Sequence, residues 1–376
     1  MTDINLGNRD GIESPARKHA IRGLGVTLLQ TVAFFLLFAV LLEGLARTSL
    51  VRELLPYMTF GSWHYQLDLK WLLLKQYVAE NGGMDVIVVG NSLVDTGVVP
   101  EVIAQTYFEK TGVKLRVFNF GIGGLTVSPT SENAKLLVDT YHPALLIFVT
   151  EMRDYDATNG IRTETKYLSD SWMQYQMGNF NPKGWLVDHS VTLQHYLPYR
   201  NWMRNDFPST FASYLGTYHA TSATGYEGDL AELTADKIPN PSTSDSNPYF
   251  SSSQPYQIDP TRLVCLGTIL DLARNGGTRI IVVEMPVHPM FFEFAGGKAI
   301  HEAFKEKIAE TVRSGGGIFL PATEEVAIPL DGRANLTHLN WKGAPIFSAY
   351  LGARLAGLTS QDGMMFISKQ NEGGQR

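Results

Sequence analysis

The chain of 376 residues contains a single cysteine, Cys265, and this scarcity excludes an internal disulfide and a cysteine-rich zinc site. Basic runs are also missing: acidic residues outnumber basic ones, and the formal net charge is -6. Nucleic-acid-binding proteins are expected to present a basic face, so this class of partner is set aside. No HExxH sequence and no glycine-rich loop ending in Lys-Ser or Lys-Thr occurs. The sequence therefore predicts no metal centre, no phosphate-binding loop and no cofactor.

The first feature that is present is an uncharged apolar run over residues 23–42. Its length is about the 20 residues that a helix needs to cross the hydrocarbon core of a membrane. Four basic residues precede the run and only two follow it closely. This asymmetry favours a cytoplasmic segment 1–22, a single membrane-spanning anchor and a body exported to the periplasm or the cell exterior. A cleaved signal peptide, whose apolar region is usually shorter, and a buried soluble helix are the alternatives.

After a juxtamembrane segment, 43–83, five short apolar runs recur between helical patterns. The juxtamembrane segment is predicted to be helical or loop-like, with Trp71 and its neighbours making contacts near the membrane surface. The apolar runs lie at about 85–90, 113–118, 144–150, 278–285 and 316–320. Runs of this kind are typical of strands that are buried on both faces. Strands that alternate with helices predict an α/β domain whose parallel sheet is covered on both sides.

One stretch, from about 155 to 256, lacks this alternation and is rich in Trp, Tyr, Asn, Ser and Pro. A structureless loop of about a hundred residues is improbable, so we interpret it as an inserted cap above the carboxyl edge of the sheet. Its aromatic side chains either form a small core of the cap or stack on sugar rings. They are Trp172, Tyr175, Trp185, Tyr196, Tyr199 and Trp202. The polar tail, 366–376, is predicted to be disordered.

Ser92 is the candidate nucleophile, because it follows the strand predicted at 85–90. Gly90 breaks that strand and Asn91 tolerates unusual backbone angles, so Ser92 is expected on a sharp turn at the carboxyl edge of the sheet. Open α/β sheets bind their ligands at that edge. A late histidine, His338, supplies the base that such a serine needs. An isolated Gly-Asn-Ser is more often a simple turn, so the assignment depends on further groups.

Those further groups follow the other predicted strands. The turn at 119–124 can present backbone amides to an oxyanion, because its glycines let the backbone approach a ligand. The block at 150–155 brings Arg153 and Asp154 to the same edge. His288 follows the fourth strand and either faces the site or is packed. Asn91, Asp154 and His288 are the candidates for substrate contact.

Taken together, four blocks resemble the ordered blocks of the SGNH (GDSL-type) hydrolase superfamily. They are Gly90-Asn91-Ser92, Asn119 to Gly124, the third-strand block ending at Arg153-Asp154, and Asn335-Leu336-Thr337-His338. The resemblance covers about 84–156 and 260–355. It implies a three-layer, flavodoxin-like domain over 84–365 with a five-stranded parallel sheet. It also implies Ser92 as the nucleophile, Gly124 as the oxyanion-hole glycine and His338 as the general base.

Two positions depart from the pattern of the family. Arg153 stands where the family has an asparagine in the oxyanion hole. Its guanidinium could donate to the oxyanion, bind an acidic group of the substrate, or pair with Asp154 or Asp156. Asn335 stands where the family has an acid. Two possibilities stay open: Asn335 orients the imidazole without a charge, or Asp331 supplies a carboxylate from the loop.

Anchored members with a similar layout include polysaccharide O-acetyltransferase subunits and the protein that assists D-alanylation of teichoic acids. The resemblance therefore implies a serine esterase or O-acyltransferase that forms an acyl-serine intermediate. Its implied substrate is an acylated, in particular acetylated, envelope or exported polysaccharide, with an integral membrane partner as a candidate acyl donor. The alternative is a catalytically weak scaffold that binds glycan or an envelope assembly partner, and Arg153 and Asn335 motivate it.

Overall fold

The computed structural model describes residues 15–55, 57–62, 64–157, 159–200, 207–241, 247–250, 256–364 and 366–367. The first fourteen residues, Trp202 and residues 368–376 of the expected tail therefore lie outside the described residues.

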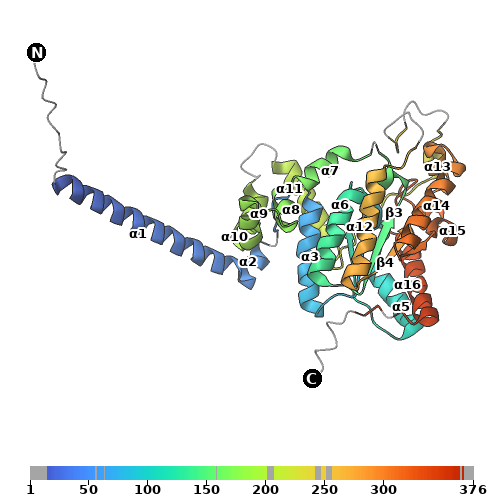
Figure 1. Cartoon of the computed structure of the whole chain (residues 1–376), viewed down its shortest axis with the longest axis horizontal. Coiled ribbons are helices and arrows are strands. Elements are labelled where there is room, and N and C mark those ends of the chain that lie inside the picture. The colour runs from blue at the N-terminus through green and yellow to red at the C-terminus, as the bar shows by residue number, and fades with distance from the viewer. Residues whose placement is uncertain are drawn as a thin grey trace, which may run out of the picture.

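Five strands and a series of helices make up the described chain (Figure 1). The strands are β1 (Val86–Gly90), β2 (Val117–Gly121), β3 (Leu145–Thr150), β4 (Arg279–Glu284) and β5 (Ile318–Leu320). The helices of the α/β body are α3 (Tyr65–Asn81), α4 (Ser92–Gly97), α5 (Pro100–Thr111), α6 (Val127–Tyr141), α12 (Pro260–Gly276), α13 (Met290–Ala295), α14 (Lys298–Ser314), α15 (Ala322–Glu325) and α16 (Gly343–Asp362), with the 3-10 turns η1 (Met152–Tyr155) and η4 (Leu330–Gly332). The remaining elements are α1 (Pro15–Ala46), α2 (Ser49–Leu54), α7 (Ile161–Leu168), α8 (Ser171–Gln176), α9 (Pro182–His189), α10 (Val191–Arg200), α11 (Phe207–Ala220) and η3 (Ala235–Lys237).

The strands form one parallel sheet in the order β2-β1-β3-β4-β5. Figure 1 shows α3, α6 and α12 on the near face of the sheet and α5 and α16 on the other. The register places Val86 opposite both Val117 and Leu145, so β1 is hydrogen-bonded on both sides. The three-layer α/β fold predicted from the alternation of strands and helices is confirmed.

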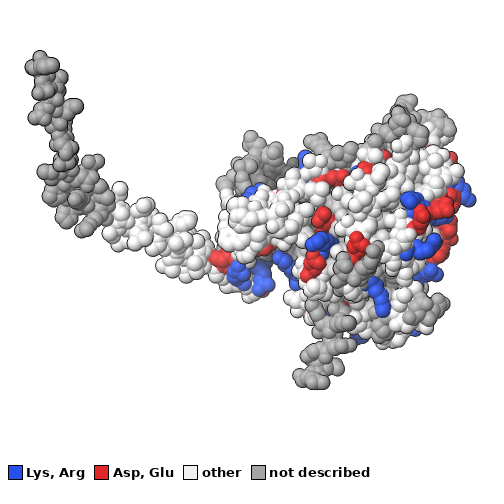
Figure 2. Space-filling view, viewed as in Figure 1, with Lys and Arg blue, Asp and Glu red and all other residues white. Residues whose placement is uncertain are grey.

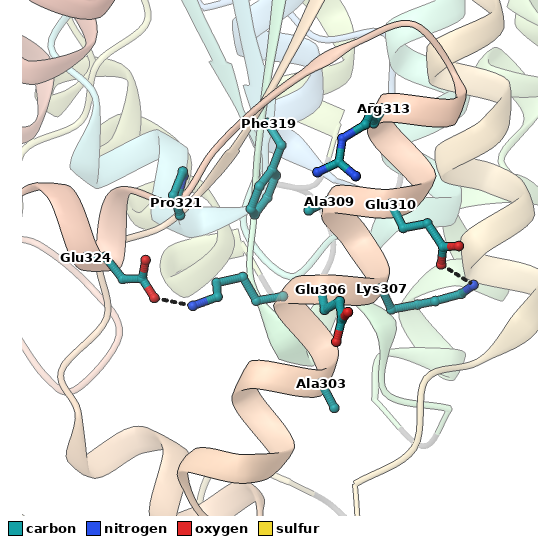
Figure 3. A pocket seen from close by; sticks show the side chains of 10 residues that line it. Ala303, Glu306, Lys307, Ala309, Glu310, Arg313, Phe319, Pro321 and Glu324 are labelled. Carbon is teal, nitrogen blue, oxygen red and sulfur yellow. Dashed lines mark hydrogen bonds and ion pairs between the residues drawn. The ribbon is translucent and has the colours of Figure 1, made fainter.

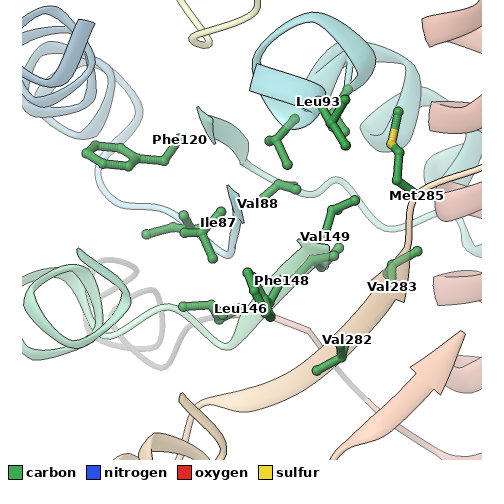
Figure 4. Close-up of a cluster of buried hydrophobic side chains, with 14 of the residues drawn as sticks. Ile87, Val88, Leu93, Phe120, Leu146, Phe148, Val149, Val282, Val283 and Met285 are labelled. Atoms are coloured by element: carbon green, nitrogen blue, oxygen red, sulfur yellow. The ribbon is translucent and has the colours of Figure 1, made fainter. Parts of the chain in front are cut away.

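The core explains why the strands could be recognised as apolar runs. All residues of β1, β2 and β3 are buried, and β4 is buried after Arg279. Side chains from β1, β3 and β4 interlock around Val88, Phe148 and Val282 (Figure 4). A strand with helices on both faces has no solvent side, so it shows no polar alternation.

The second strand begins later than expected. Residues 113–118 were predicted, but β2 runs from Val117 to Gly121 and includes Asn119. The side-chain amide of Asn119 is fully buried and donates to the carbonyl oxygens of Val94 and Val98, both at 2.7 Å. A buried amide needs such partners, and they come from α4 and the residue after it. The polarity of Asn119 therefore concealed a strand position.

The segment after α1 also differs from expectation. Trp71 on α3 is only 4% exposed, and its ring packs against that of Phe120 on β2, with 5.4 Å between the ring centroids. The neighbouring Leu74 is fully buried. Helix α3 is thus a covering helix of the sheet, and the expectation of membrane contacts for Trp71 is wrong. The expected tail begins too early as well, because Phe366 is buried against Tyr107.

The inserted segment leaves and rejoins the body at one place. Asp156 forms an antiparallel bridge with Ile258, and the amide of Asp259 donates to the carbonyl of Tyr155 at 2.8 Å. Helices α8 to α11 gather beside α3 and the end of α1 (Figure 1), instead of all lying above the carboxyl edge. Trp172 is buried and stacks on Phe60 at 4.4 Å, so it belongs to the core that joins the insertion to the body.

A buried ion pair joins α3 to α4 and carries a prediction on stability. Lys70 Nζ lies 2.5 Å from Asp95 Oδ1, and neither side chain is more than 3% exposed. Burial raises the pKa of Asp95, and Lys70 opposes that rise. Removing Lys70 leaves an unpaired buried carboxylate, so Lys70→Met is expected to lower the free energy of unfolding by about 3–5 kcal/mol. Urea denaturation followed by circular dichroism measures the change.

The matched control is Lys135→Met. Lys135 pairs with Asp139 at 2.8 Å on the surface, with both side chains more than half exposed. Exposed pairs contribute little, so this variant is expected to unfold within about 1 kcal/mol of the wild type. Equal losses for the two variants would contradict the role given to the buried pair.

Candidate active site

Ser92 and His338, 246 residues apart, meet at the carboxyl edge of the sheet. Ser92 Oγ lies 2.8 Å from His338 Nε2. Ser92 is the first residue of α4, directly after β1, and both side chains are only partly exposed. Gly90 is required at this turn, because a Cβ there would lie 2.5 Å from Val94 Cγ2 and 2.7 Å from the carbonyl oxygen of Val149. The arrangement places a hydroxyl beside the ring nitrogen that could take its proton.

Asn335 orients the imidazole of His338. Asn335 Oδ1 lies 3.2 Å from His338 Nδ1 and also accepts the backbone N–H of His338 at 2.9 Å. An amide oxygen only accepts, so Nδ1 carries the proton and Nε2 is left as an acceptor toward Ser92. The hydroxyl of Thr337 adds a second contact to Nδ1 at 3.1 Å. The tautomer that a general base needs is therefore selected without a carboxylate.

The structure does not place Asp331 beside His338 and gives no support to the alternative in which Asp331 supplies the carboxylate. The Asp331 side chain is 62% exposed and its carboxylate lies 3.4 Å from Lys342 Nζ. Asp331 is held in this position because the loop wraps around Asn340. The fully buried side-chain amide of Asn340 donates to the backbone carbonyl of Asp331 at 2.8 Å. A carboxylate does act on His338, but it is Asp229 of the inserted segment, which raises the pKa of His338. Sequence spacing contains no signal for Asp229, because it lies 109 residues upstream of the histidine.

The pKa of His338 falls from 6.5 to about 4, mainly through burial and further through the positive charge of Arg153. Asp229 only partly opposes this shift. A buried imidazolium next to a cation is unfavourable, so the ring stays neutral over most of the acidic range.

If His338 acts as the base, the acid limb of kcat/KM is expected near pH 4 instead of near the ordinary histidine value of 6.5. Below that pH, Nε2 carries a proton and cannot accept the one on Ser92, so activity falls. The measurement is kcat/KM on an uncharged ester between about pH 3 and pH 8, with circular dichroism at each pH to exclude unfolding. A limb close to 6.5 in a folded protein would contradict the environment described for His338.

Asn91 and Asp154 hold the turn that carries Ser92, and substrate contact by either residue stays a prediction. Both are buried, at 9% and 3% exposure. Asn91 Oδ1 accepts the amide of Leu93 at 2.8 Å and caps α4, while its Nδ2 donates to Asp154 Oδ1 at 2.7 Å. Asp154 Oδ2 accepts the hydroxyl of Thr150 at 2.8 Å. Asn91 and Asp154 therefore link the ends of β1 and β3, and burial raises the pKa of the Asp154 carboxyl.

The glycine turn lies beside Ser92. Gly124 adopts a left-handed φ of 74°, and a Cβ placed on Gly123 would lie 3.9 Å from Ser92 Cβ. The amide of Gly123 is already used, because it donates to Gln66 Oε1 at 2.8 Å. Among the described residues, no partner is found for the amide of Gly124. Of the two glycine amides, that of Gly124 is the one available to an oxyanion.

Two residues at the start of α3 complete this turn, and sequence reasoning missed both. Gln66 binds Gly123 and also donates through Nε2 to Asp95 Oδ2 at 2.8 Å, one helical turn after Ser92. His64 hydrogen-bonds the backbone of Gly123, and burial lowers its pKa to about 4. Neither residue belongs to a recognisable motif, and no local pattern could have placed them beside Ser92.

Gln66→Leu is expected to lower kcat by about 10- to 100-fold with a smaller change in KM, because a small displacement of reacting groups reduces the rate strongly. The leucine side chain cannot accept the hydrogen bond from the amide of Gly123. Gly123 and the neighbouring Gly124 are then no longer held against α3, and the rate falls. The rate should be normalised to the fraction of protein that a serine-directed probe titrates. A structural defect alone would lower that fraction without changing the normalised rate. Gln76→Leu, an exposed position on the same helix, is the matched control.

Arg153 is bound on two sides. Its Nε lies 2.6 Å from Glu151 Oε1, and its Nη2 donates to Thr337 Oγ1 at 3.3 Å. The guanidinium also lies over the ring of Phe291, with 5.8 Å between its central carbon and the ring centroid. The suggested pairing with Asp154 or Asp156 is thus replaced by Glu151, which caps η1. Arg153 joins the third block to the loop of His338 and remains beside that histidine, whose pKa it lowers.

His288 hydrogen-bonds the first residue of α13, next to the same loop. Its Nδ1 accepts the amide of Met290 at 3.1 Å, and its backbone amide donates to Leu336 at 2.7 Å. His288 therefore has the packed role considered for it, and substrate contact by His288 stays a prediction.

A hollow of about 710 Å³ lies elsewhere, between α14 and β5, where Lys305 pairs with Glu324 (Figure 3). Its lining includes none of the residues around Ser92.

The described part of the chain holds no group of three or more His, Cys, Asp or Glu side chains that could bind a metal ion. The groups that the structure places at the site are the hydroxyl of Ser92, the imidazole of His338, backbone amides and the guanidinium of Arg153.

No family model matches the chain, and no curated protein matches it. Solved structures do resemble it. A gut microbial diltiazem-metabolizing enzyme is 11% identical with a TM-score of 0.34, and the match covers 73% of this chain and 47% of that one, about half its length. A GDSL-like lipase from Bacteroides thetaiotaomicron is 12% identical with a TM-score of 0.33, covering 76% and 97% of the two chains. A catalytic mutant of an acetylxylan esterase from Geobacillus stearothermophilus is 11% identical with a TM-score of 0.34, covering 76% and 96%. The activities in these names belong to those proteins.

Proposed function

We propose that this protein is an SGNH-type serine esterase or O-acyltransferase, held at a membrane by α1 and acting on an acylated carbohydrate. The observation that carries the proposal is the 2.8 Å contact between Ser92 Oγ and His338 Nε2, with Asn335 on the far side of the ring. A hydroxyl, a base and an orienting group in this order form an activated nucleophile.

In the proposed reaction, Ser92 Oγ attacks the carbonyl carbon of an ester while its proton passes to His338 Nε2. The resulting oxyanion accepts hydrogen bonds from the amides of Ser92 and Gly124. The intermediate collapses, the carbon–oxygen bond of the leaving alcohol breaks, and His338 returns the proton to that alcohol. Water or a sugar hydroxyl then attacks the acyl-serine, with His338 again taking the proton, and Ser92 is restored.

The substrate class is the finer part of the proposal. The ordered blocks resemble a superfamily that includes anchored polysaccharide acyltransferases, and an acetyl ester of an envelope or exported polysaccharide suits that layout. An integral membrane protein that delivers the acyl group is the corresponding partner. This step rests on analogy of family, whereas the serine chemistry rests on the site.

Labelling of the purified full-length chain with a fluorophosphonate probe tests the proposal. The expected result is a single labelled peptide that contains Ser92, with labelling slowed in His338→Ala. Ser171→Ala is the matched control, because Ser171 is also the first residue of a helix, α8 in the inserted segment. Hydrolysis of acetylated sugar esters, with and without an acceptor sugar, then separates an esterase from a transferase.

The second candidate function is a glycan-binding scaffold without useful catalysis. The low pKa of His338, at about 4, and the lack of a carboxylate at Nδ1 favour it, since both make the base weak. It predicts intact glycan binding together with no labelling of Ser92 and no turnover of acetyl esters.

A further inference from the structure

Six large apolar side chains are exposed at the end of the body to which α1 attaches. They form a surface that we name the interfacial patch: Leu50, Leu54, Phe180, Trp185, Leu186 and Tyr196. Their exposure runs from 44% for Trp185 to 76% for Phe180. They belong to α2, α9, α10 and the turn before α9, and Figure 1 shows these three helices together next to α1. Large exposed apolar side chains that gather at one end of a protein mark an interaction site.

Helix α9 shows how the patch is built. Gly184 and Val187 are buried, and a Cβ on Gly184 would lie 2.2 Å from the carbonyl oxygen of Ser171 on α8. The opposite side of the same helix exposes Trp185 and Leu186. The helix is therefore held by its small face, and its large apolar face stays exposed apart from the contact of Trp185 with His189 of the same helix.

This surface is tied to the last turn of α1 by hydrogen bonds. The Glu43 carboxylate accepts the hydroxyl of Ser190 at 3.0 Å and the amide of Val191 at 2.8 Å, at the start of α10. Arg47 Nη2 donates to the carbonyl oxygen of His189 at 3.1 Å, and the His189 ring stacks on Trp185 at 5.0 Å. The position of the patch is thus fixed relative to Glu43 and Arg47.

The length of α1 sets the depth of Glu43 and Arg47 relative to a membrane that α1 spans. The uncharged run 23–42 is about 30 Å long as a helix, which matches the hydrocarbon core of a bilayer. Glu43 follows it directly, so Glu43 and Arg47 lie at the level of the lipid headgroups when α1 spans a membrane. Tryptophan and tyrosine are enriched at that level, because each has an apolar ring and a polar group.

The charges around the patch suit a lipid surface. Arg47, Arg52 and Lys183 are exposed beside it. Figure 2 shows a largely uncharged surface at this end of the body, with basic side chains and an acidic one near the foot of α1, where Glu43 pairs with Arg47. Apolar residues flanked by basic ones are the pattern of elements that lie in a membrane interface.

We propose that the interfacial patch docks into the headgroup region of the same bilayer that α1 spans. The inference rests on the placement of α1 in a membrane and is independent of the proposed chemistry. The body then rests on the lipid surface in one orientation, and the Ser92 site is held at a fixed height above it.

Electron paramagnetic resonance on the full-length chain tests this docking. Cys265→Ser removes the native thiol, and a nitroxide is attached to a cysteine introduced by Leu186→Cys. The protein is reconstituted in nanodiscs of equal parts phosphatidylcholine and phosphatidylglycerol. Collision with oxygen, which dissolves in lipid, is compared with collision with a water-soluble nickel chelate. Leu36→Cys in α1 is the lipid reference, and Phe108→Cys on α5 is the matched exposed control.

The expected result is an oxygen-to-nickel ratio at Leu186 several-fold above that at Phe108 and close to that at Leu36. A ratio at Leu186 equal to that at Phe108, with a lipid-like value at Leu36, would overturn docking while leaving the anchor in place. An aqueous value at Leu36 would overturn the placement of α1 and the docking with it. Shielding of Leu186 from both reagents would show a protein contact instead, and would also overturn the proposal. None of these outcomes depends on labelling of Ser92, so the two proposals fail separately.

Discussion

Ser92→Ala is expected to lower turnover of acetyl esters by about four to six orders of magnitude. The reason is the loss of the only hydroxyl that the structure places at hydrogen-bond distance from His338 Nε2 among the described residues, at 2.8 Å. The side chain is partly exposed and caps nothing, since Asn91 supplies the cap of α4. The fold should therefore be retained. Steady-state kinetics of the wild type and the variant measure the loss of turnover. Circular dichroism on the same samples checks that both are folded.

The control for Ser92→Ala is again Ser171→Ala, which should keep full turnover. A Ser92→Ala variant that retains more than about a hundredth of the activity would show that the hydroxyl is not the nucleophile. Binding of acetylated oligosaccharide should survive the change, because the variant loses only an oxygen atom. Loss of binding together with turnover would show that the change disturbs the site beyond the nucleophile.

Asn335→Asp is expected to raise kcat/KM at neutral pH by about 10-fold or more and to move the acid limb upward from about pH 4. Asn335 Oδ1 already accepts from the imidazole at 3.2 Å and from the backbone amide of His338 at 2.9 Å. A carboxylate oxygen in that place keeps these bonds and adds a negative charge beside the ring. The charge stabilises the imidazolium, so the pKa of His338 rises and the ring becomes a stronger base.

The matched control is Asp331→Asn, which changes a carboxylate on the same loop that points to Lys342. It should leave both the rate and the pH profile unchanged. An Asn335→Asp variant with an unchanged acid limb would mean that the base is not His338, or that the new carboxylate turns away. A crystal structure or the proton chemical shift of His338 Nδ1 would separate these two explanations.

The fold was predictable because burial on both faces leaves a simple trace in the sequence. The strands β1, β3 and β4 consist almost wholly of apolar residues, and each lies within a few residues of its predicted range. β2 was displaced, since Asn119 is a polar residue whose buried amide is satisfied by carbonyl groups from another part of the chain. Periodicity reports whether a position is buried, but it does not report which polar groups find partners inside.

The candidate site also has a part that the sequence could predict and a part that it could not. That Ser92 and His338 would reach one edge followed from each standing after a predicted strand, because parallel strands end on the same side. Asn91 and Asp154 were expected to contact substrate because they are polar, and the structure shows that their polar groups also join two strand ends. Gln66 and His64 could not be found at all, because α3 reaches Gly123 only after the whole sheet has formed.

The local pattern of residues was enough to place the strands, the apolar run that forms α1 and the order of the polar blocks, because each depends on neighbours within a few positions. Only the tertiary structure decided that Asn335 and not Asp331 orients His338, that Glu151 binds Arg153, and that the amide of Gly123 is taken by Gln66. A hydrogen bond requires its two groups to meet within about 3 Å at a suitable angle. For Gln66 and Gly123, which are 57 residues apart, that meeting is set by packing between separate elements and not by any spacing along the chain.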